Sequence, residues 1–398
     1  MLDLSKLAKQ IPEISQEMKR EAAASLQRLE IAQRLLRQAE KRQEELLEIQ
    51  KTWSDRLIFS PATPVESINT QIKIDFAPDI HTVFATDGSQ LAPSHHEIAY
   101  CYLINIGKIM LHYGQNLHPF LDSLPEVYYK SEDLYASRQW GIRTEEWIGY
   151  RRTVAEIQIL ADMAYCWVNP PGAHVNIPNL AFVDGSLIYW FLDSLPVEAR
   201  DLILQPIFAA WEKLRETKIP LMGYISAPRS IEALNFLRLQ ACPYSLPNCT
   251  INCSGFSQKT PCQVSDPLRD ATLWSHLLEP GYRGALWKSS LKILDLYDQP
   301  YQIYFCYVNV GTEIARLEFP AYVVEDTELF DRSLSIMLGQ VQKGYGYPIS
   351  LSEAHNIAVV KGGDRTRFFA LLQQHMIRNG IYNVKTSYKE TRKRGSIA

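Results

Sequence analysis

Two copies of one tripeptide are the strongest candidates for chemistry in this sequence. Asp87-Gly88-Ser89 follows the apolar run 83–86, and Asp184-Gly185-Ser186 follows the apolar run 180–183. One Asp-Gly after a strand is commonly only a turn, whereas two that both follow core strands indicate a shared site. If the two strands are neighbours in a sheet, both carboxylates lie close together at one edge, where they repel unless a cation binds between them or one is protonated. Oxygen donors of this kind favour Mg²⁺ or Mn²⁺.

A third carboxylate, Glu156, lies between the two tripeptides. Its apolar neighbours recur with helical spacing, which places Glu156 on the buried stripe of a helix. A buried acid is costly unless it is paired or bound to a cation. Two interpretations remain open: Glu156 completes a site for one or two metal ions with Asp87 and Asp184, or it pairs with Arg152 four residues earlier.

A His and a Tyr near the C-terminus are candidates for handling a phosphate or a proton. Both belong to the segment 344–355, in which Tyr347 precedes a Pro and His355 follows Ser352 by three residues. We expect Ser352 to cap a helix and to bring His355 into its first turn. Near clustered carboxylates, His355 and Tyr347 could donate to a phosphate oxygen or assist proton transfer. The alternative is that His355 is a structural residue.

Composition restricts the class of protein. The chain has 398 residues, 46% of them hydrophobic and 21% charged, which is ordinary globular usage and excludes disordered and collagen-like proteins. Its formal net charge of -3 excludes a polybasic nucleic-acid binder, so DNA or RNA contacts would depend on local basic patches and metal ions. No apolar run is long enough to cross a membrane, and the N-terminus lacks the order of a signal peptide. Seven cysteines, an odd number, favour a reducing compartment, so we expect a cytoplasmic protein without membrane association.

The elements that must position these residues follow from the periodicity. Residues 12–61 predict one long amphipathic helix, and Ser60 to Pro64 is a linker. Strands are predicted at 82–87, 98–106 and 109–113, with a turn at Gly107-Lys108. A helix at 145–166, a strand at 180–184, a helix at 196–215 and a strand at 221–227 follow. This order predicts an α/β protein with a ribonuclease H-like mixed sheet flanked by helices.

Elements beyond residue 227 and the domain limits are expected as follows. Helices are predicted at 270–278, 333–343 and 352–361, and strands at 302–310 and 313–324. We expect residues 1–60 to pack on the chain's own domain or to serve dimerisation or partner docking, 61–382 to form the main domain, and 383–398 to be a basic mobile tail.

Several motifs together resemble the NurA nuclease family. They are the two Asp-Gly-Ser tripeptides, the late Gly-Tyr-Pro...Ala-His stretch, and the segments 278–283 and 316–320, which together cover roughly residues 82–369. The resemblance implies a ribonuclease H-like core, manganese-dependent endonuclease and 5′-to-3′ exonuclease activity on DNA, and a homodimer. It also implies a hexameric HerA-type ATPase translocase as partner in the resection of double-strand breaks. Carried over by motif, Asp87, Asp184 and Glu156 match the family's metal ligands, and Tyr347 and His355 match its late Tyr and His.

Two features depart from the family's pattern. Gly281-Tyr282-Arg283-Gly284 stands where family members often carry Gly-Glu-Arg-Ser. Four cysteines, Cys242, Cys249, Cys253 and Cys262, form an insertion near residues 242–262 that lacks CxxC pairs. They could hold zinc or an iron-sulfur cluster, or be free or redox-labile thiols.

The sequence as a whole predicts a Mn²⁺- or Mg²⁺-dependent DNA nuclease with Asp87, Glu156, Asp184, Tyr347 and His355 at its catalytic centre. Arg229, Arg283 and Lys288 are expected to contact backbone phosphates without reading sequence. Two alternatives stay open: a catalytically silent adaptor that clamps DNA for a translocase, and an actin-like or sugar-kinase-like phosphotransferase.

Overall fold

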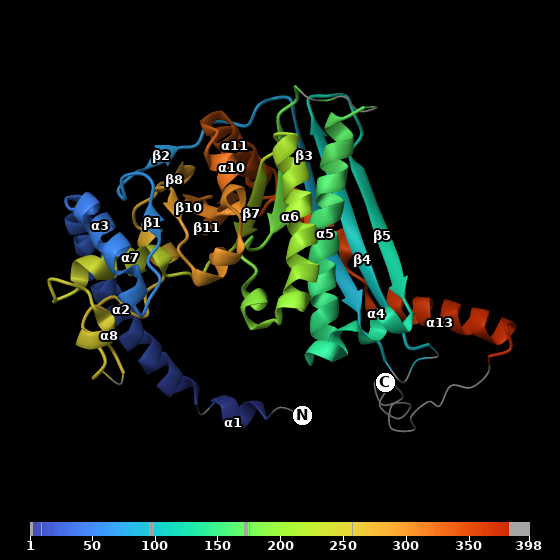
Figure 1. Ribbon diagram of the computed structural model, residues 1–398, viewed down its shortest axis with the longest axis horizontal. Coiled ribbons are helices and arrows are strands. Elements are labelled where there is room, and N and C mark those ends of the chain that lie inside the picture. Colours follow the sequence, from blue (N-terminus) through green and yellow to red (C-terminus); the bar gives the residue numbers. More distant parts are fainter. Residues whose placement is uncertain are drawn as a thin grey trace. The chain divides into compact units, whose positions relative to one another are not determined.

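The computed structural model describes residues 3–381 except 9, 95, 96, 98, 171–173, 175 and 257. The chain forms two compact units (Figure 1): unit 1 comprises Met1–Asp75, Gly185–Ile188 and Gly223–Glu325, and unit 2 comprises Phe76–Asp184, Tyr189–Met222 and Asp326–Ala398. The tail expected at 383–398 lies outside the described residues. Among the described helices, none combines the length and the apolarity that a membrane span requires.

Unit 2 is built on a mixed sheet that contains the two predicted aspartates. Its strands are β3 (His81–Leu91), β4 (Tyr102–Tyr113), β5 (Phe120–Tyr128), β6 (Asn179–Asp184) and the first two residues of β7 (Leu221–Ile225). They are ordered β7-β6-β3-β4-β5. β3, β4 and β5 form an antiparallel meander, and β6 is parallel to β3. This confirms the predicted α/β class and the strand order of a ribonuclease H-like sheet.

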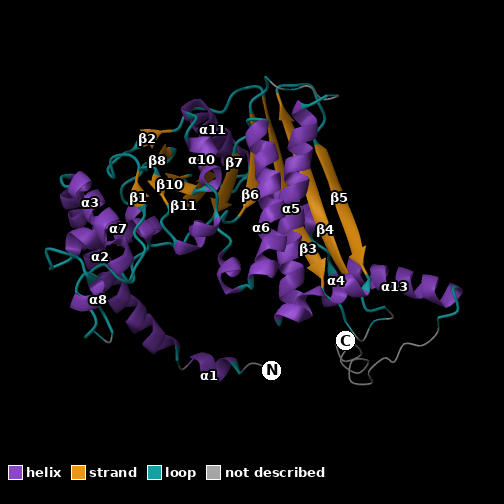
Figure 2. Ribbon diagram, viewed as in Figure 1, coloured by secondary structure: helices purple, strands orange, loops and turns teal. Residues whose placement is uncertain are grey.

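Helices cover both faces of this sheet. They are α4 (Ser131–Tyr135), α5 (Thr144–Val168), α6 (Val197–Glu216), α11 (Thr327–Lys343), α12 (Ile349–Ala358) and α13 (Gly362–Arg378). α5 and α6 run side by side (Figure 2), and α5 packs on β3, where a Cβ at Gly88 would meet its side chains. α12 packs on β4, where a Cβ at Gly107 would meet its backbone. Because Gly107 pairs with Asp87 and successive strand residues point to opposite faces, α5 and α12 lie on opposite faces.

Two predicted turns are wrong because they lie inside strands. Asp87-Gly88-Ser89 was expected to end a strand, yet β3 continues to Leu91 and pairs with β4 throughout. Gly107-Lys108 was expected to turn between two strands, yet both residues lie within β4. The third strand of the meander is therefore β5 and not residues 109–113. In each case glycine serves a close approach of a helix to the sheet, which sequence alone does not distinguish from a turn.

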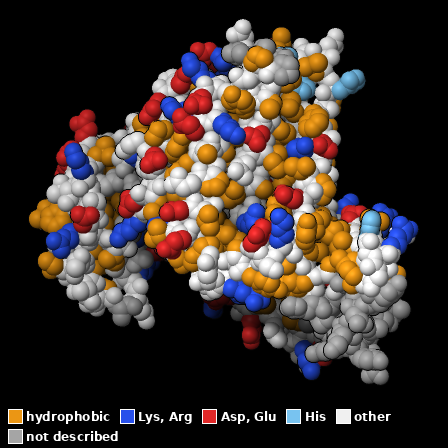
Figure 3. All heavy atoms as spheres, turned by 45° about the vertical axis from the view of Figure 1, so that its right-hand side comes forward, with side chains coloured by type: hydrophobic (Ala, Val, Ile, Leu, Met, Phe, Trp, Pro, Cys, Tyr) orange, Lys and Arg blue, Asp and Glu red, His pale blue; other side chains and the backbone are white. Residues whose placement is uncertain are grey.

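β5 is an edge strand of the unit 2 sheet and is open to solvent. Eight of its nine residues are exposed. The exposed side chains include Phe120, Leu121, Leu124 and Val127. Figure 3, which brings this side of the molecule forward, shows hydrophobic side chains interspersed with charged ones. An exposed edge of this kind can pair with a further strand or be covered by a partner.

Unit 1 combines a second, mostly antiparallel set of strands with the N-terminal helices. Its strands are β1 (Thr63–Pro64), β2 (Ile72–Lys73), β8 (Tyr282–Arg283), β9 (Trp287–Lys288), β10 (Ile303–Asn309), β11 (Ile314–Pro320) and the last three residues of β7. Its helices are α1 (Leu4–Ala8), α2 (Ile11–Glu40), α3 (Gln43–Trp53), α7 (Glu232–Ala241), α8 (Cys249–Asn252), α9 (Asp270–Trp274) and α10 (Ala321–Val324). One hydrophobic core joins α2, α3, α7 and α9 to β9 and β10.

The N-terminal region is not the single helix predicted. α2 ends at Glu40 and α3 begins at Gln43, because tertiary contacts at the junction override helix propensity. The Gln43 side chain bonds to the carbonyl of Glu66 and the amide of Ile68, each at 2.9 Å. The second half of the predicted stripe is buried in unit 1, whereas Ile14 and Met18 in the first half are 54% and 68% exposed.

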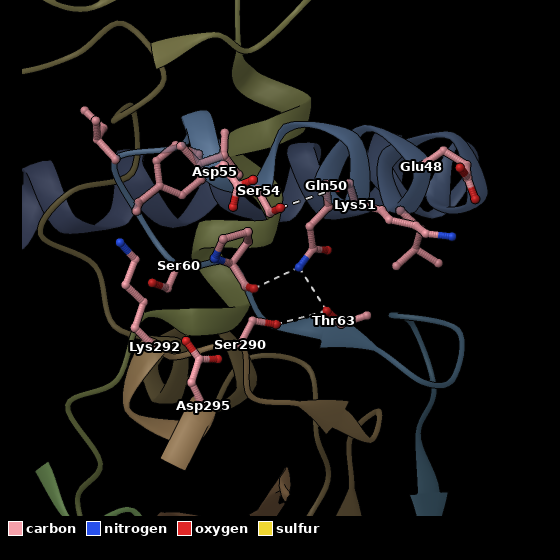
Figure 4. Close-up of a pocket in the computed structure, with 15 residues that line it drawn as sticks. Glu48, Gln50, Lys51, Ser54, Asp55, Ser60, Thr63, Ser290, Lys292 and Asp295 are labelled. Carbon is pink, nitrogen blue, oxygen red and sulfur yellow. Dashed lines mark hydrogen bonds between the residues drawn. The ribbon is translucent and has the colours of Figure 1, made fainter. Parts of the chain in front are cut away.

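A broad pocket of about 790 Å³ lies where α3 joins the strand β1 (Figure 4). Gln50 crosses it and donates to the Pro61 carbonyl and to Thr63 Oγ1, each at 2.9 Å. Lys51 and Lys292 line the pocket, as do acidic residues such as Asp55. The predicted site carboxylates are not part of this pocket, since all of them belong to unit 2.

Candidate active site

The two predicted aspartates lie at matching positions of neighbouring parallel strands. Thr86 of β3 is in register with Val183 of β6, so Asp87 and Asp184 each follow a paired residue. Parallel register carries both carboxylates to the same end of the two strands. Asp184 is the last residue of β6, as predicted, whereas Asp87 is flanked on both sides by strand residues.

Asp87 is bonded to His355. Its Oδ2 lies 2.7 Å from His355 Nδ1, and its Oδ1 accepts a hydrogen bond from the Gly88 amide at 2.8 Å. The Asp87 side chain is 23% exposed and that of His355 is 62% exposed, so the pair faces solvent at the imidazole side. The sequence therefore identified two residues, 268 positions apart, that the fold brings into contact.

Close packing of α12 on β4 produces this contact. A Cβ at Gly107 would lie 2.8 Å from the backbone nitrogen of Ala358, so only glycine lets the helix approach the strand this closely. Asn105 and Ser89 hold the end of the helix by donating to the Ala358 carbonyl, Asn105 at 2.8 Å and Ser89 at 2.5 Å. The expected capping by Ser352 is wrong: α12 begins at Ile349 after Pro348, so His355 lies in the second half of the helix.

Glu156 reaches the same place from the opposite face of the sheet. Its carboxylate occupies the space above Gly88, where a Cβ would also lie 2.7 Å from Arg152 Cγ. The missing side chain at Gly88 thus opens a path for Glu156 towards Asp87. Arg152 Nε lies 3.2 Å from Glu156 Oε1, which is an ion pair but not a well-aligned hydrogen bond. The pairing with Arg152 that the sequence left open is observed, and the role of Glu156 as a metal ligand stays a prediction.

The pKa values of Glu156 and Asp184 show that these carboxyl groups are buried and lie near other acids. Burial raises the pKa of Glu156 from 4.5 to about 8; Arg152 opposes the shift, and the charges of Asp87 and Asp184 add to it. The pKa of Asp184 is raised as well, by partial desolvation and by the charge of Asp87. A hydrogen bond with Tyr347 and the charge of His355 act in the opposite direction on Asp184. The five residues predicted for the catalytic centre therefore all interact with one another through Asp87 and Asp184.

The amino-acid sequence matches the NurA domain family over residues 81–360, which include all five of these residues. The chain belongs to this family. Membership supports a nuclease. Among solved structures, the crystal structure of the NurA nuclease from Sulfolobus solfataricus is similar, with 13% sequence identity and a TM-score of 0.48 over 85% of this chain and 95% of that chain. No curated protein matches the sequence.

The donor chemistry of the NurA domain fits a divalent cation. Asp87 and Asp184 supply carboxylate oxygens, and the charge of Asp87 helps to raise the pKa of Asp184, a repulsion that a cation between them would offset. Within the described residues, no three His, Cys, Asp or Glu side chains are already grouped as metal ligands. Glu156 is instead directed at Arg152, so joining Asp87 and Asp184 as a ligand requires it to lose its proton and turn away from Arg152.

The chain that leaves Asp184 is fixed by a buried ion-pair network in unit 1. Glu318 Oε2 accepts hydrogen bonds from Ser186 Oγ at 2.7 Å and from the Leu187 amide at 2.8 Å. Arg316 lies between Glu318 and Glu232, at 2.8 Å from each. Sequence reasoning identified the Arg-Leu-Glu-Phe-Pro segment only as a family motif. Two charged residues alternating with apolar ones in a core strand were the signal that could have revealed this structural role.

The three predicted phosphate-binding residues, all in unit 1, differ in their surroundings. Arg229 is exposed, and Lys288 is partly exposed with its Nζ 5.9 Å from the ring centre of Tyr304. Arg283 is 5% exposed and pairs with Glu66, with Nη1 2.7 Å from Oε2. The charge of Arg283 is already satisfied inside the protein, so its position favours a structural role over contact with a phosphate.

The raised pKa of Glu156 predicts how the stability of the metal-free protein depends on pH. The unfolded chain loses this proton near pH 4.5 and the folded chain only near pH 8, so rising pH in that interval favours unfolding. We expect the free energy of unfolding in chelator to fall by on the order of 3 kcal/mol more in the wild type than in Glu156→Gln between pH 5 and pH 8.5. Urea unfolding of both proteins at the two pH values measures this difference. An identical pH dependence in the two proteins would show that Glu156 is not a buried neutral acid.

Proposed function

We propose that the protein is a metal-dependent DNA nuclease that hydrolyses phosphodiester bonds at the Asp87–Asp184 site. The observation that carries the proposal is the convergence of these two carboxylates on neighbouring parallel strands, with His355 bonded to Asp87. Family membership supports nuclease activity, and the excess of acidic groups supports a requirement for Mn²⁺ or Mg²⁺.

Asp87, Asp184 and, once deprotonated, Glu156 would hold one or two divalent ions. When bound, such an ion supplies positive charge against the scissile phosphate and the leaving 3′ oxygen and lowers the pKa of water. Asp87 also holds His355 through Nδ1. The other ring nitrogen, Nε2, would then donate to a phosphate oxygen or exchange a proton at the leaving group. Tyr347, hydrogen-bonded to Asp184, would fix the orientation of that carboxylate.

Details of activity and partners are proposed from the family resemblance. They are 5′-to-3′ exonuclease and endonuclease action, and a role in resecting double-strand break ends with a hexameric HerA-type ATPase translocase. A homodimer would have two surfaces available, the edge strand β5 and the exposed first half of α2. Cytoplasmic location is consistent with the seven cysteines, all of which are free thiols.

Replacing Asp184 tests the proposed chemistry. We expect Asp184→Asn to lower cleavage of end-labelled linear DNA by at least about 100-fold in Mn²⁺, since the neutral amide removes a charged ligand. Asp162→Asn is a matched control, because Asp162 is an exposed aspartate of α5 that bonds to Lys213. Its activity should equal that of the wild type, and chelator should abolish activity in both.

Other results would favour one of the two alternative functions, the silent DNA-clamping adaptor or the phosphotransferase. Equal cleavage by Asp184→Asn and wild type would place the chemistry elsewhere. No cleavage by the wild type, with or without a translocase, together with intact DNA binding would favour the silent adaptor. Binding of ATP by the chain alone would favour the phosphotransferase.

Arg229 and Lys288 are proposed to bind backbone phosphates. Removing one side chain that binds a phosphate should reduce the slope of log affinity against log salt by about 1. Arg229→Gln and Lys288→Gln are therefore each expected to flatten the slope, measured by fluorescence anisotropy with a labelled duplex in chelator. Arg20→Gln, which neutralises a 77% exposed arginine on α2, is the control and should leave the slope unchanged. Slopes equal to that of the wild type in both test variants would remove these residues from the DNA surface.

A further inference from the structure

Four cysteines of unit 1 surround one small cavity. Cys242 follows α7, Cys249 begins α8, Cys253 follows α8, and Cys262 lies in the next loop. All four line a cavity of about 10 Å³, and none forms a disulfide. Cys249, Cys253 and Cys262 are 5%, 9% and 4% exposed. Figure 1 shows this segment, in yellow, beside α2. Residues 242–262 therefore converge although their sequence lacks CxxC pairs.

Arg238 on α7 lines the same cavity and is a buried cation without a counter-charge. It is 8% exposed, and its hydrogen bonds go to Asn235 Oδ1 at 3.2 Å, Thr260 Oγ1 at 3.3 Å and Cys262 Sγ at 3.5 Å, none of them a carboxylate. The Phe59 ring lies 3.8 Å from the guanidinium carbon. Within the part of the chain that the structure describes, no carboxylate pairs with Arg238, and its Nε has no hydrogen-bond partner.

A buried, unpaired guanidinium is unfavourable, so an anionic group at this cavity is expected. The cysteine sulfurs are the groups that could supply it. A cation bound by several thiolates would carry a net negative charge next to Arg238, so one bound ion would account both for the convergence of the four sulfurs and for the unpaired guanidinium.

We propose that Cys242, Cys249, Cys253 and Cys262 bind one zinc ion as thiolates, with Arg238 as the counter-ion of the site. The four thiols would lose four protons to solvent on binding. Zn²⁺ and four thiolates together carry a net charge of about -2, which Arg238 partly offsets. Four sulfur ligands are typical of zinc or iron-sulfur sites. In this structure the cavity of about 10 Å³ has space for a single ion. An iron-sulfur cluster needs more space and is the alternative that metal analysis distinguishes.

Binding would draw the sulfurs together from the positions they have in this structure. Within the described residues, no three metal-binding side chains are already grouped as ligands. Among the residues described between α7 and α9, the short helix α8 is the one regular element, and binding would move the loops on either side of it. Once closed, it would be fixed to α7, which packs on α2 in the core of unit 1. The site is therefore structural and does not depend on the proposed nuclease activity.

Metal analysis of the full chain tests the proposal. Protein purified under reducing, anaerobic conditions is expected to contain about one zinc per chain, and Cys249→Ser/Cys253→Ser should contain less than about a tenth of that. Cys166→Ser, which changes an exposed cysteine of unit 2, is the control and should retain zinc. Zinc well below one per chain in the wild type, stoichiometric iron, or equal zinc in the double variant would each overturn the proposal.

Cobalt substitution on the wild type keeps the test decisive if the double variant does not fold. Co²⁺ added to metal-free, reduced wild type should give the intense absorption of tetrahedral cobalt-thiolate bonds, and one equivalent of Zn²⁺ should remove it. Arg238→Gln should weaken zinc binding by about 10-fold in competition with a chelator, as loss of a supporting residue commonly does. Absence of the thiolate absorption, or unchanged zinc affinity in Arg238→Gln, would contradict the proposed site and the role of Arg238, respectively.

Discussion

Mutual repulsion among three carboxylates is the constraint on which the candidate site depends. The repulsion among Asp87, Asp184 and Glu156 would be lower if they lay further apart, yet the fold keeps them near one another. Burial is the main cause that raises the pKa of Glu156 to about 8, and the charges of Asp87 and Asp184 add to the shift. Two glycines make this possible, since Gly88 leaves room for Glu156 on one face of β3 and Gly107 admits α12 on the other. The energy that holds the acids together comes from the core of the sheet and its helices and not from the acids themselves.

The same electrostatic problem occurs with opposite sign in unit 1. Arg316 is almost fully buried but lies between Glu232 and Glu318, so its charge is compensated and the chain after Asp184 is fixed. Arg238 is buried with no carboxylate partner among the described residues, and one of its hydrogen bonds goes to Cys262. A buried charge with an opposite charge beside it serves the structure, whereas the unpaired Arg238 and the neighbouring aspartates of unit 2 indicate where an ion could bind.

Sequence reasoning reached the site because the signals were repeated and local. Two apolar runs followed by the same tripeptide indicated Asp87 and Asp184, although the first tripeptide lies inside β3, and an acid on an apolar helix stripe indicated Glu156. It failed where the cause lies in another part of the chain. A glycine in the sequence can indicate either a turn or a place where a helix packs closely on a strand. At Gly88 and Gly107 it is the close packing, and the helices responsible, α5 and α12, lie elsewhere in the sequence. Gln43, the first residue of α3, is held by contacts with residues 66 and 68, and the buried Arg283 pairs with Glu66. None of these partners can be identified from local periodicity.

Direct binding of Mn²⁺ in the absence of DNA tests the central claim that the crowded acids form a metal site. Electron paramagnetic resonance of free Mn²⁺ during titration of the chain gives the number of sites and their affinity. The thiolate cavity would not interfere, because Mn²⁺ prefers oxygen ligands. We expect one or two sites in the wild type and an affinity at least about tenfold lower in Asp87→Asn. Equal binding by the two proteins, or no binding by the wild type, would contradict the account.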